Sequence, residues 1–353
     1  MAAEATDFQA WRRLALDPPR ARGDPPLSGR VRAEPADFLV EERLGFEPDG
    51  GSAHFLLLVE KENANTQFVA RELAARIGRP AHEIGFAGLK DRRAVARQWF
   101  SLPAVKGKEP AAGLSGEGFT VLAAYPHSRK LRRGALAGNG FRIRIREPRL
   151  DSAALAERLA RLAAEGFPNY FGVQRFGIDA ANLRRVMDWL AGARLPRGRE
   201  PRGFLMSAAR ALAFNAVLGR RVADASWNRL LAGEIVNLSG SGSVFAAAVI
   251  DDALQQRCSA GDVAPTGPLC GTGGMVPTGV AAMVEAAALE PLAPLPQRLG
   301  EAGLAAERRA LVVRPAGLQQ QVMPDAIELG FELPRGAYAT SLLREVMTTA
   351  IVD

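Results

Sequence analysis

One short segment of the chain combines the residue types that could do chemistry. Residues 85–99 read Gly-Phe-Ala-Gly-Leu-Lys-Asp-Arg-Arg-Ala-Val-Ala-Arg-Gln-Trp, so one carboxylate, Asp91, follows a Gly-x-x-Gly turn and stands among a lysine and three arginines. Nearby cations favour the charged form of a carboxylate, and the same cations can hold a phosphate backbone against it. The segment is therefore typical either of chemistry on nucleic acid or, on charge alone, of a turn with a solvated ion-pair cluster.

Composition narrows the class of protein. The 353 residues suffice for one large domain or two ordinary ones. The chain has 45 basic and 38 acidic residues, a formal charge of +7, which fits a polyanionic partner. No apolar run approaches the length that crosses a bilayer, and residues 1–13 carry acids and Trp11 where a signal peptide would be apolar. We expect a cytoplasmic protein with no membrane partner.

The sequence offers no signal for a metal ion or another cofactor. Cys258 and Cys270 are too few for a disulfide scaffold or a four-thiolate site, and the three histidines lack metal-ligand spacing. The glycine-rich stretch 269–274 lacks the flanking strand and helix signals of a nucleotide-binding loop. We predict that the protein uses no cofactor.

Hydrophobic periodicity predicts strands early, helices in the middle and strands again near the end. Strand patterns cover residues 37–42, 54–60, 84–86, 98–102, 119–124, 310–313 and 326–333. Helical patterns cover a helix that begins at Asn65 or Thr66 and ends at Gly78, residues 151–165 before Gly166, most of 182–231, and a helix from about Ser341.

Three further segments have a distinct character. Residues 141–146 alternate strictly between apolar residues and arginine, which predicts a half-buried strand whose arginine face is either solvated or follows a phosphate backbone. Residues 1–30 are rich in arginine and proline and read as a loosely packed arm. The Gly/Pro-rich stretch 261–279 reads as an interruption of regular structure. The order of elements indicates an α+β fold, with a mixed-sheet domain built from both ends of the chain and an insertion between them.

The chain resembles the TruD family of tRNA pseudouridine synthases over nearly its whole length. Residues 85–99 are similar to the family's catalytic motif G-x-K-D-x-x-A-x-x-Q-W. Four more segments match family motifs in the correct order: Ala36-Asp37-Phe38-Leu39-Val40-Glu41-Glu42, His127-Ser128-Arg129-Lys130-Leu131-Arg132 with Gly138-Asn139-Gly140-Phe141, Pro168-Asn169-Tyr170-Phe171-Gly172-Val173-Gln174-Arg175-Phe176-Gly177, and Tyr338-Ala339-Thr340-Ser341 with Arg344-Glu345. Five motifs in order leave little room for coincidence. Two positions depart from the family pattern: Tyr338 replaces a common phenylalanine, and Ala96 stands where many members carry threonine.

The resemblance implies an architecture and a reaction. It implies a pseudouridine synthase catalytic domain with a mixed, mostly antiparallel sheet, formed by residues 1–164 and 313–353, and a family-specific α/β insertion domain at residues 165–312. It implies an isomerase that converts uridine to pseudouridine at position 13, in the D arm of tRNA. It implies tRNA as the partner, no cofactor and no obligate protein partner.

The resemblance also assigns roles to residues. Asp91 is the catalytic carboxylate, which either attacks C1′ of the ribose or removes the 2′ proton. Because the target base must leave the tRNA stack, Phe38, Phe141 and Tyr338 are expected to stack on it and Asn139 to hydrogen-bond its edge. From the residues alone, a core side chain is a serious alternative for Phe141, and Asn139 is equally consistent with a turn residue. The hydroxyl of Tyr338 needs a partner or water.

The remaining candidates are charged. Lys90 either orients Glu42 or another acid, or contacts phosphate, because adjacent residues of an extended segment point to opposite sides. Arg129, Lys130 and Arg132 are expected to contact the RNA backbone, with a solvated basic loop as the alternative. Arg175 either faces the RNA or holds the hinge between domains.

The sequence disfavours two other classes of protein. A nuclease or glycosidase with paired carboxylates is disfavoured because no second acid lies near Asp91 in the sequence and no acidic metal-binding cluster is present. A non-catalytic RNA-binding protein of the same fold is disfavoured because the motif around Asp91 is intact.

Overall fold

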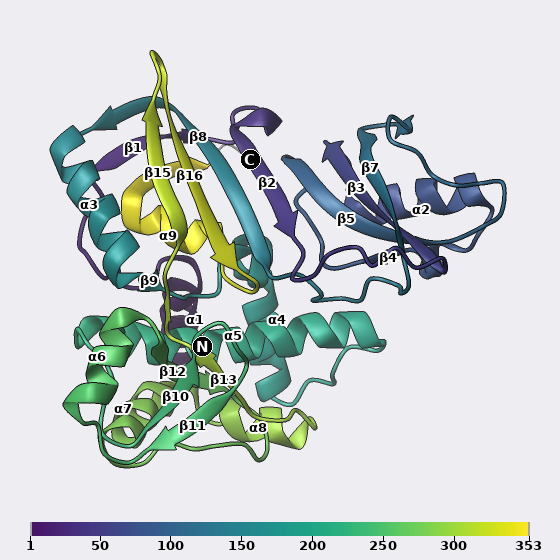
Figure 1. Ribbon diagram of the computed structural model, residues 1–353. Coiled ribbons are helices and arrows are strands. Elements are labelled where there is room, and N and C mark those ends of the chain that lie inside the picture. Colours follow the sequence, from purple (N-terminus) through teal and green to yellow (C-terminus); the bar gives the residue numbers. More distant parts are fainter. Residues whose placement is uncertain (1, 352–353) are drawn as a thin grey trace. The chain divides into compact units, whose positions relative to one another are not determined.

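The computed structural model describes residues 2–351, which form two compact units (Figure 1). Residues 26–159, 315–336 and 347–351 form one of them, called here the large-sheet unit. Residues 2–25, 160–314 and 337–346 form the other, called here the α5 unit after its longest helix. Each unit therefore combines segments that lie far apart in the sequence.

The large-sheet unit contains one mixed sheet. Its strands within the described residues are β1 (Leu27–Val31), β2 (Phe38–Arg43), β3 (His54–Glu62), β4 (Gly85–Phe86), β5 (Val95–Pro103), β6 (Ser115–Gly116), β7 (Phe119–His127), β8 (Gly138–Leu150), β15 (Ala316–Val322), β16 (Ala326–Pro334) and β17 (Met347–Ile351). The main path runs β15-β16-β8-β2-β5-β3-β7-β6. The pairs β2·β5 and β1·β17 are parallel and the other pairs are antiparallel. The predicted mixed, mostly antiparallel sheet is confirmed.

Helix α2 (Thr66–Ile77) shows how local sequence sets an element of this unit. The Asn65 side chain accepts a hydrogen bond from the Phe68 amide at 2.7 Å and so caps the first turn. Gly78 ends the helix with a left-handed φ of 68°, which glycine adopts without strain. Val69, Leu73 and Ile77 then pack in a core with the inward residues of β3, β5 and β7. The predicted helix and its ends are confirmed.

The alternating segment 141–146 is the middle of β8, as predicted. Ile143 and Ile145 are buried on one face, and the arginines lie on the other. Arg144 pairs with Glu328 at 3.3 Å, and Arg146 pairs with Asp37 at 2.9 Å and Glu34 at 2.8 Å. Two arginines of this face are therefore neutralised by acids within the same unit.

The α5 unit consists of a 25-residue helix, several shorter helices and a four-stranded sheet. Its helices are α1 (Ala2–Leu16), α4 (Ala181–Leu190), α5 (Arg199–Ala223), α6 (Asp252–Ala260), α7 (Gly279–Leu289), α8 (Leu295–Glu301) and α9 (Ala339–Val346), and α3 (Ser152–Glu165) leads into it. Its strands are β9 (Phe167–Pro168), β10 (Glu234–Leu238), β11 (Val244–Ala247), β12 (Val263–Leu269), β13 (Glu307–Ala310) and β14 (Val312–Val313). The sheet order is β11-β10-β12-β13, and β9 pairs with β14.

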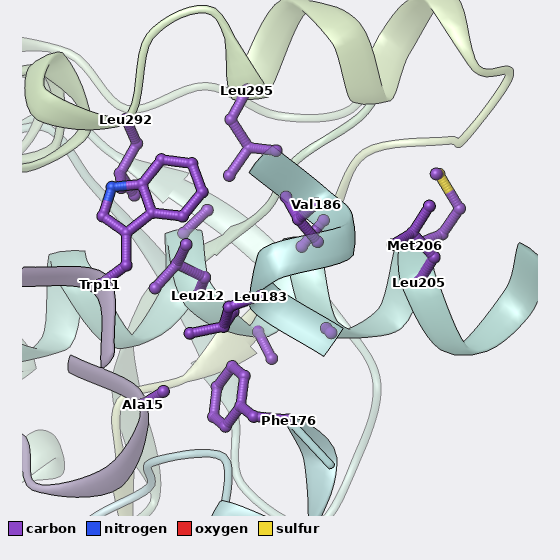
Figure 2. Close-up of a cluster of buried hydrophobic side chains, with 14 of the residues drawn as sticks. Trp11, Ala15, Phe176, Leu183, Val186, Leu205, Met206, Leu212, Leu292 and Leu295 are labelled. Carbon is purple, nitrogen blue, oxygen red and sulfur yellow. The ribbon is translucent and has the colours of Figure 1, made fainter. Parts of the chain in front are cut away.

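The N-terminal segment is a helix, and the expectation of a loosely packed arm at residues 1–30 is wrong. Trp11 and Ala15 of α1 are buried in a core with Leu183 and Leu212 (Figure 2). The backbone carbonyl of Leu14 accepts a hydrogen bond from Asn215 of α5 at 3.2 Å. The arginines and prolines after residue 16 hid the three- and four-residue spacing of the apolar residues before it.

The Gly/Pro-rich stretch 261–279 also differs from its prediction. Residues 263–269 form β12, an internal strand that is almost wholly buried, between β10 and β13. Prolines are rare in internal strands because they cannot donate to the ladder, so Pro265 and Pro268 concealed it. Gly267 is required by packing, because a Cβ there would lie 2.9 Å from Leu311 and 3.0 Å from Phe214 of α5.

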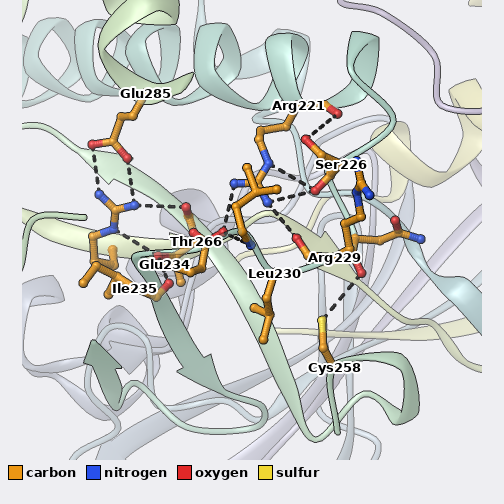
Figure 3. A network of polar contacts seen from close by, with 12 residues as sticks. Arg221, Ser226, Arg229, Leu230, Glu234, Ile235, Cys258, Thr266 and Glu285 are labelled. Carbon is orange, nitrogen blue, oxygen red and sulfur yellow. Dashed lines mark hydrogen bonds and ion pairs between the residues drawn. The ribbon is translucent and has the colours of Figure 1, made fainter. Parts of the chain in front are cut away.

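A buried polar network links α5 to this sheet (Figure 3). Arg221 pairs with Glu234 at 2.9 Å, and both side chains are buried. Arg221 also donates to the backbone carbonyls of Ser226 and Arg229. Burial raises the pKa of Glu234, and Arg221 opposes that shift. Because an unpaired buried charge is costly, this pair fixes how α5 packs on β10.

The predicted division into a catalytic domain and an insertion stays a prediction. Within the described residues, the compact units assign residues 2–25 and 337–346 to the same unit as residues 160–314. None of the helices in the described part of the chain has the length and apolar character needed to span a membrane.

We expect Trp11→Ala to lower the free energy of unfolding by about 3–5 kcal/mol, because truncating a buried aromatic side chain leaves a cavity. Arg12→Ala, on the exposed side of the same helix, should change it by less than about 0.5 kcal/mol. Urea denaturation followed by circular dichroism measures both. Equal, small effects would show that the N-terminal helix does not pack in the core.

Candidate active site

Asp91 lies in the loop between β4 and β5 of the large-sheet unit, with 55% of its side chain exposed. Its Oδ2 accepts a hydrogen bond from Arg32 at 2.7 Å. Arg32 follows β1 with a positive φ of 60°, and its guanidinium lies 4.2 Å from the centre of the Phe38 ring. The carboxylate is thus held by a cation that lies 59 residues earlier in the sequence.

Three of the cations near Asp91 in the sequence, Lys90, Arg92 and Arg97, form other contacts. Lys90 forms a short ion pair with Glu42. Arg92 donates to the backbone carbonyl of Asn63 at 3.0 Å. Arg97 pairs with Glu60 at 2.9 Å and with Glu41 at 3.3 Å. The cation that pairs with the Asp91 side chain is therefore Arg32, which the sequence analysis missed.

A buried polar network fixes the loop that carries Asp91. Glu42 Oε2 accepts a hydrogen bond from the Trp99 amide at 3.0 Å, and Lys90 contacts the other oxygen, Oε1. Gln98 Nε2 donates to the Gly88 carbonyl at 2.6 Å. Thr66 donates from its hydroxyl to Gln98 at 2.9 Å and accepts the Lys90 amide at 3.1 Å. The glycine, lysine, glutamine and tryptophan of the 85–99 motif are thus joined by hydrogen bonds, which explains their spacing.

Lys61 is the second residue that the sequence analysis missed. Its side chain is fully buried, and its Nζ donates to the backbone carbonyls of Asp91 at 2.8 Å and Ala64 at 2.9 Å. Burial lowers the pKa of Lys61 to about 8, with Lys90 acting in the same direction and Asp91 and Glu42 opposing it. A signal existed, because Lys61 continues the inward face of β3 after Leu57 and Val59.

Strand register brings the predicted base-binding residues of this unit to one face of the sheet. Phe38, Val40 and Glu42 of β2 lie opposite Ile143, Phe141 and Asn139 of β8, and residues that lie opposite each other point to the same face. The Phe38 and Phe141 rings meet edge to face at 6.1 Å between centroids. Phe141 also stacks on Phe331 at 5.3 Å. Asn139 Oδ1 is buried without a hydrogen-bond partner in the structure.

The predicted phosphate-binding residues Arg129, Lys130 and Arg132 are exposed around a cavity of about 730 Å³. Lys130 Nζ donates to the His82 carbonyl at 2.6 Å. Asp49 borders the same cavity, where hydrogen bonds from Ser128 and Gly51 hold its pKa below the usual range. This segment therefore presents three cations at the surface, beside one stably charged acid.

Arg175 and Tyr338 lie in the α5 unit, where they contact each other. Arg175 donates to the Tyr338 hydroxyl at 2.5 Å and to the Ser207 hydroxyl at 2.9 Å. Its guanidinium lies 5.6 Å from the centre of the Phe171 ring. The partner that the Tyr338 hydroxyl requires is thus Arg175.

The chain is similar to known proteins over most of its length. A sequence model of the family described as tRNA pseudouridine synthase D (TruD) matches residues 20–198 and 193–346. The chain is 44% identical over 93% of its length to tRNA pseudouridine synthase D of Nitrosococcus oceani, covering 93% of that protein. It is 41% identical over 94% of its length to the Methylococcus capsulatus protein of the same name, covering 94% of it.

A solved structure supports the fold. The crystal structure of a putative tRNA pseudouridine synthase D from Methanosarcina mazei superposes with a TM-score of 0.70 at 21% identity, covering 95% of this chain and 97% of that one. The fold is therefore shared despite low sequence identity.

We expect the buried Lys61 to make stability depend on pH. In the folded protein it loses its proton near pH 8, whereas the unfolded chain keeps it up to the ordinary value of 10.5. The unfolded state binds more protons between these values, so the free energy of unfolding contributed by this group should rise as pH increases through that window.

Urea denaturation at several pH values between 7.5 and 10 measures this contribution in the wild type and in Lys61→Met. The variant should lack the part of the rise that is due to Lys61. The same pH dependence in both proteins would contradict burial of the ammonium group.

Proposed function

The chain belongs to the tRNA pseudouridine synthase D family, and from that premise we propose that it isomerises uridine to pseudouridine at position 13, in the D arm of tRNA, without a cofactor. The observation that carries the proposal is Asp91, an exposed carboxylate whose loop is fixed by buried groups. We place its action in the cytoplasm, where its RNA substrate would be met.

The reaction breaks the bond between N1 of uracil and C1′, turns the base and forms a bond from C5 to C1′. The proton on C5 leaves and N1 gains one, so substrate and product are isomers. No electron or external group is consumed. The protein must hold the ribose against one reactive group and keep the detached base in place.

Asp91 is the group that we propose acts on the ribose, by attack at C1′ or by removal of the 2′ proton. Either role requires a carboxylate with little freedom. Arg32 donates to one side-chain oxygen of Asp91, and Lys61 donates to its backbone carbonyl. We propose that Lys90 is a positioning residue that acts through Glu42, because its ammonium group pairs with Glu42 and not with Asp91.

The flipped uracil is proposed to bind beside Phe38, Phe141 and Asn139. An unpartnered buried acceptor such as Asn139 Oδ1 is costly, and the N3–H donor of uracil would satisfy it. Tyr338 is proposed to stack on the base from the α5 unit, with Arg175 fixing its hydroxyl.

Arg129, Lys130, Arg132 and Arg175 are proposed to contact the RNA backbone. The first three support this by their exposure beside a broad cavity. We further propose that residues 1–164 and 313–353 form the catalytic domain and residues 165–312 the family-specific insertion.

Asp91→Asn is expected to form no pseudouridine with unmodified tRNA, while its dissociation constant for tRNA stays within about twofold of wild type, because phosphate contacts dominate affinity. Chemical mapping of pseudouridine after incubation without added cofactor gives both the product and its position. Replacing uridine 13 by cytidine in the tRNA should abolish the product.

Full turnover by Asp91→Asn would remove this residue from the chemistry. Product at another uridine would refute the position. A wild-type protein that binds tRNA and forms no product would indicate an RNA-binding protein of the same fold.

Arg129→Gln/Lys130→Gln/Arg132→Gln is expected to weaken tRNA binding about tenfold to a hundredfold and to lower the slope of log affinity against log salt by about 2–3, from three lost phosphate contacts. The matched control replaces Arg71, Lys106 and Lys108, three exposed cations elsewhere in the large-sheet unit, by glutamine. Equal losses in both variants would indicate general charge attraction and no specific contact.

A further inference from the structure

The α5 unit contains a groove that none of the assigned site residues lines. It has a volume of about 520 Å³ and lies along the first half of α5. Its polar lining comes from Arg199, Arg202, Ser207 and Arg210, and its apolar lining includes Phe171 and Leu304. We call it the α5 groove.

The cationic residues of the α5 groove follow one face of a single helix. Arg199, Arg202 and Arg210 are spaced by three and eight residues, which keeps them within about 80° of one another around the helix axis. Eleven residues of α-helix span about 16 Å, which is longer than one phosphate group. The row of charges therefore fits an extended anion.

The positive charge of this row is largely uncompensated. Arg202 donates to the Ala302 carbonyl at 3.0 Å, and Arg210 donates to the carbonyls of Leu269 and Ala305 at 2.9 and 3.0 Å. Because carbonyls are neutral, these hydrogen bonds orient the guanidinium groups without neutralising their positive charge. The acid paired with Arg210 is Glu307, at 3.9 Å and 65% exposed, and such surface pairs contribute little.

Several other arginines of the protein are instead paired closely with acids. Arg144 and Arg146 of β8, and Arg221 and Arg308 of the α5 unit, contact carboxylates at 3.3 Å or less. Arginines held by carbonyls keep free N–H donors in fixed directions, which suits recognition of phosphate oxygens.

A glycine of α5 keeps the groove open. A Cβ added at Gly203 would meet no atom within 4 Å. Glycine inside a helix costs about 1 kcal/mol relative to alanine, and nothing in the local packing requires it at Gly203. The open space beside Gly203 is consistent with a ligand that fills the groove there.

The groove is continuous with residues proposed to meet RNA. Ser207 lines it and accepts the hydrogen bond from Arg175, which also holds Tyr338. Phe171 also lines the groove, and its ring centre lies 5.6 Å from the Arg175 guanidinium.

We propose that the α5 groove binds a stretch of the tRNA phosphodiester backbone, through Arg199, Arg202 and Arg210, next to the nucleotide held by Tyr338. The inference rests on the proposed function for the identity of the RNA and adds a binding site to it.

The test uses two variants of the full chain and unmodified tRNA. Arg199→Gln/Arg202→Gln removes two charges from the groove. Gly203→Leu places an aliphatic side chain in the groove and leaves every charge in place. The matched control is Arg220→Gln/Arg257→Gln, which removes two exposed arginines of the same unit outside the groove.

Fluorescence anisotropy at several salt concentrations measures tRNA affinity. The double arginine variant should bind about tenfold more weakly, with a salt slope lower by about 1.4–1.8 for two lost phosphate contacts. Gly203→Leu should also bind more weakly while its free energy of unfolding is not reduced. The control should bind like wild type.

Wild-type affinity of both groove variants would overturn the proposal, and so would equal losses in the groove and control variants. Single-turnover pseudouridine formation with saturating protein separates this outcome from failure of the proposed function. If the groove proposal alone is wrong, wild type still forms pseudouridine. If the proposed function is wrong, wild type forms none, yet the affinity differences between groove and control variants remain.

Discussion

The hydrogen bonds from one buried ammonium group to two backbone carbonyls are the constraint on which the candidate active site depends. Lys61 joins Asp91 to Ala64 and so ties the loop after β4 to the turn after β3. Burying a charge costs free energy unless it is paired and hydrogen-bonded. If the loop moved away, the buried ammonium group would lose its hydrogen bond to the Asp91 carbonyl. An exposed carboxylate thereby acquires a defined place.

The other polar groups near Asp91 either hold the loop or contact the carboxylate. Glu42, Thr66 and Gln98 satisfy one another and the backbone of the loop, and Lys90 is part of this network. Arg32 alone contacts the side chain of Asp91 among the described ion pairs. The supporting charges are therefore committed to structure, which leaves the carboxylate as the exposed group.

Arginine has two distinct uses in this chain, and its partners decide which applies. On β8 and in the buried network of the α5 unit, arginines contact carboxylates and hold elements together. In the α5 groove they are oriented by carbonyls and keep their charge available. Counting arginines in the sequence cannot separate these uses, because the partners come from distant segments.

By itself the sequence determined the family, the fold class and most elements whose signals are local. The caps of α2 and the alternation of β8 are read directly, because each depends on residues within one turn or one strand. It also placed Asp91, Glu42, Asn139 and Phe141 in motifs that the strand register then brings to one region of one unit.

Only the tertiary structure decided what touches these residues. Arg32 and Lys61 lie far from Asp91 along the chain, and although the alternation of β3 indicates that Lys61 is buried, it does not indicate its partner. Trp11 became a core residue and Pro265 part of an internal strand because packing against α5 and its sheet overrides weak local signals. Local pattern specifies which elements form, whereas the partner of each charge follows from which segments the fold brings together.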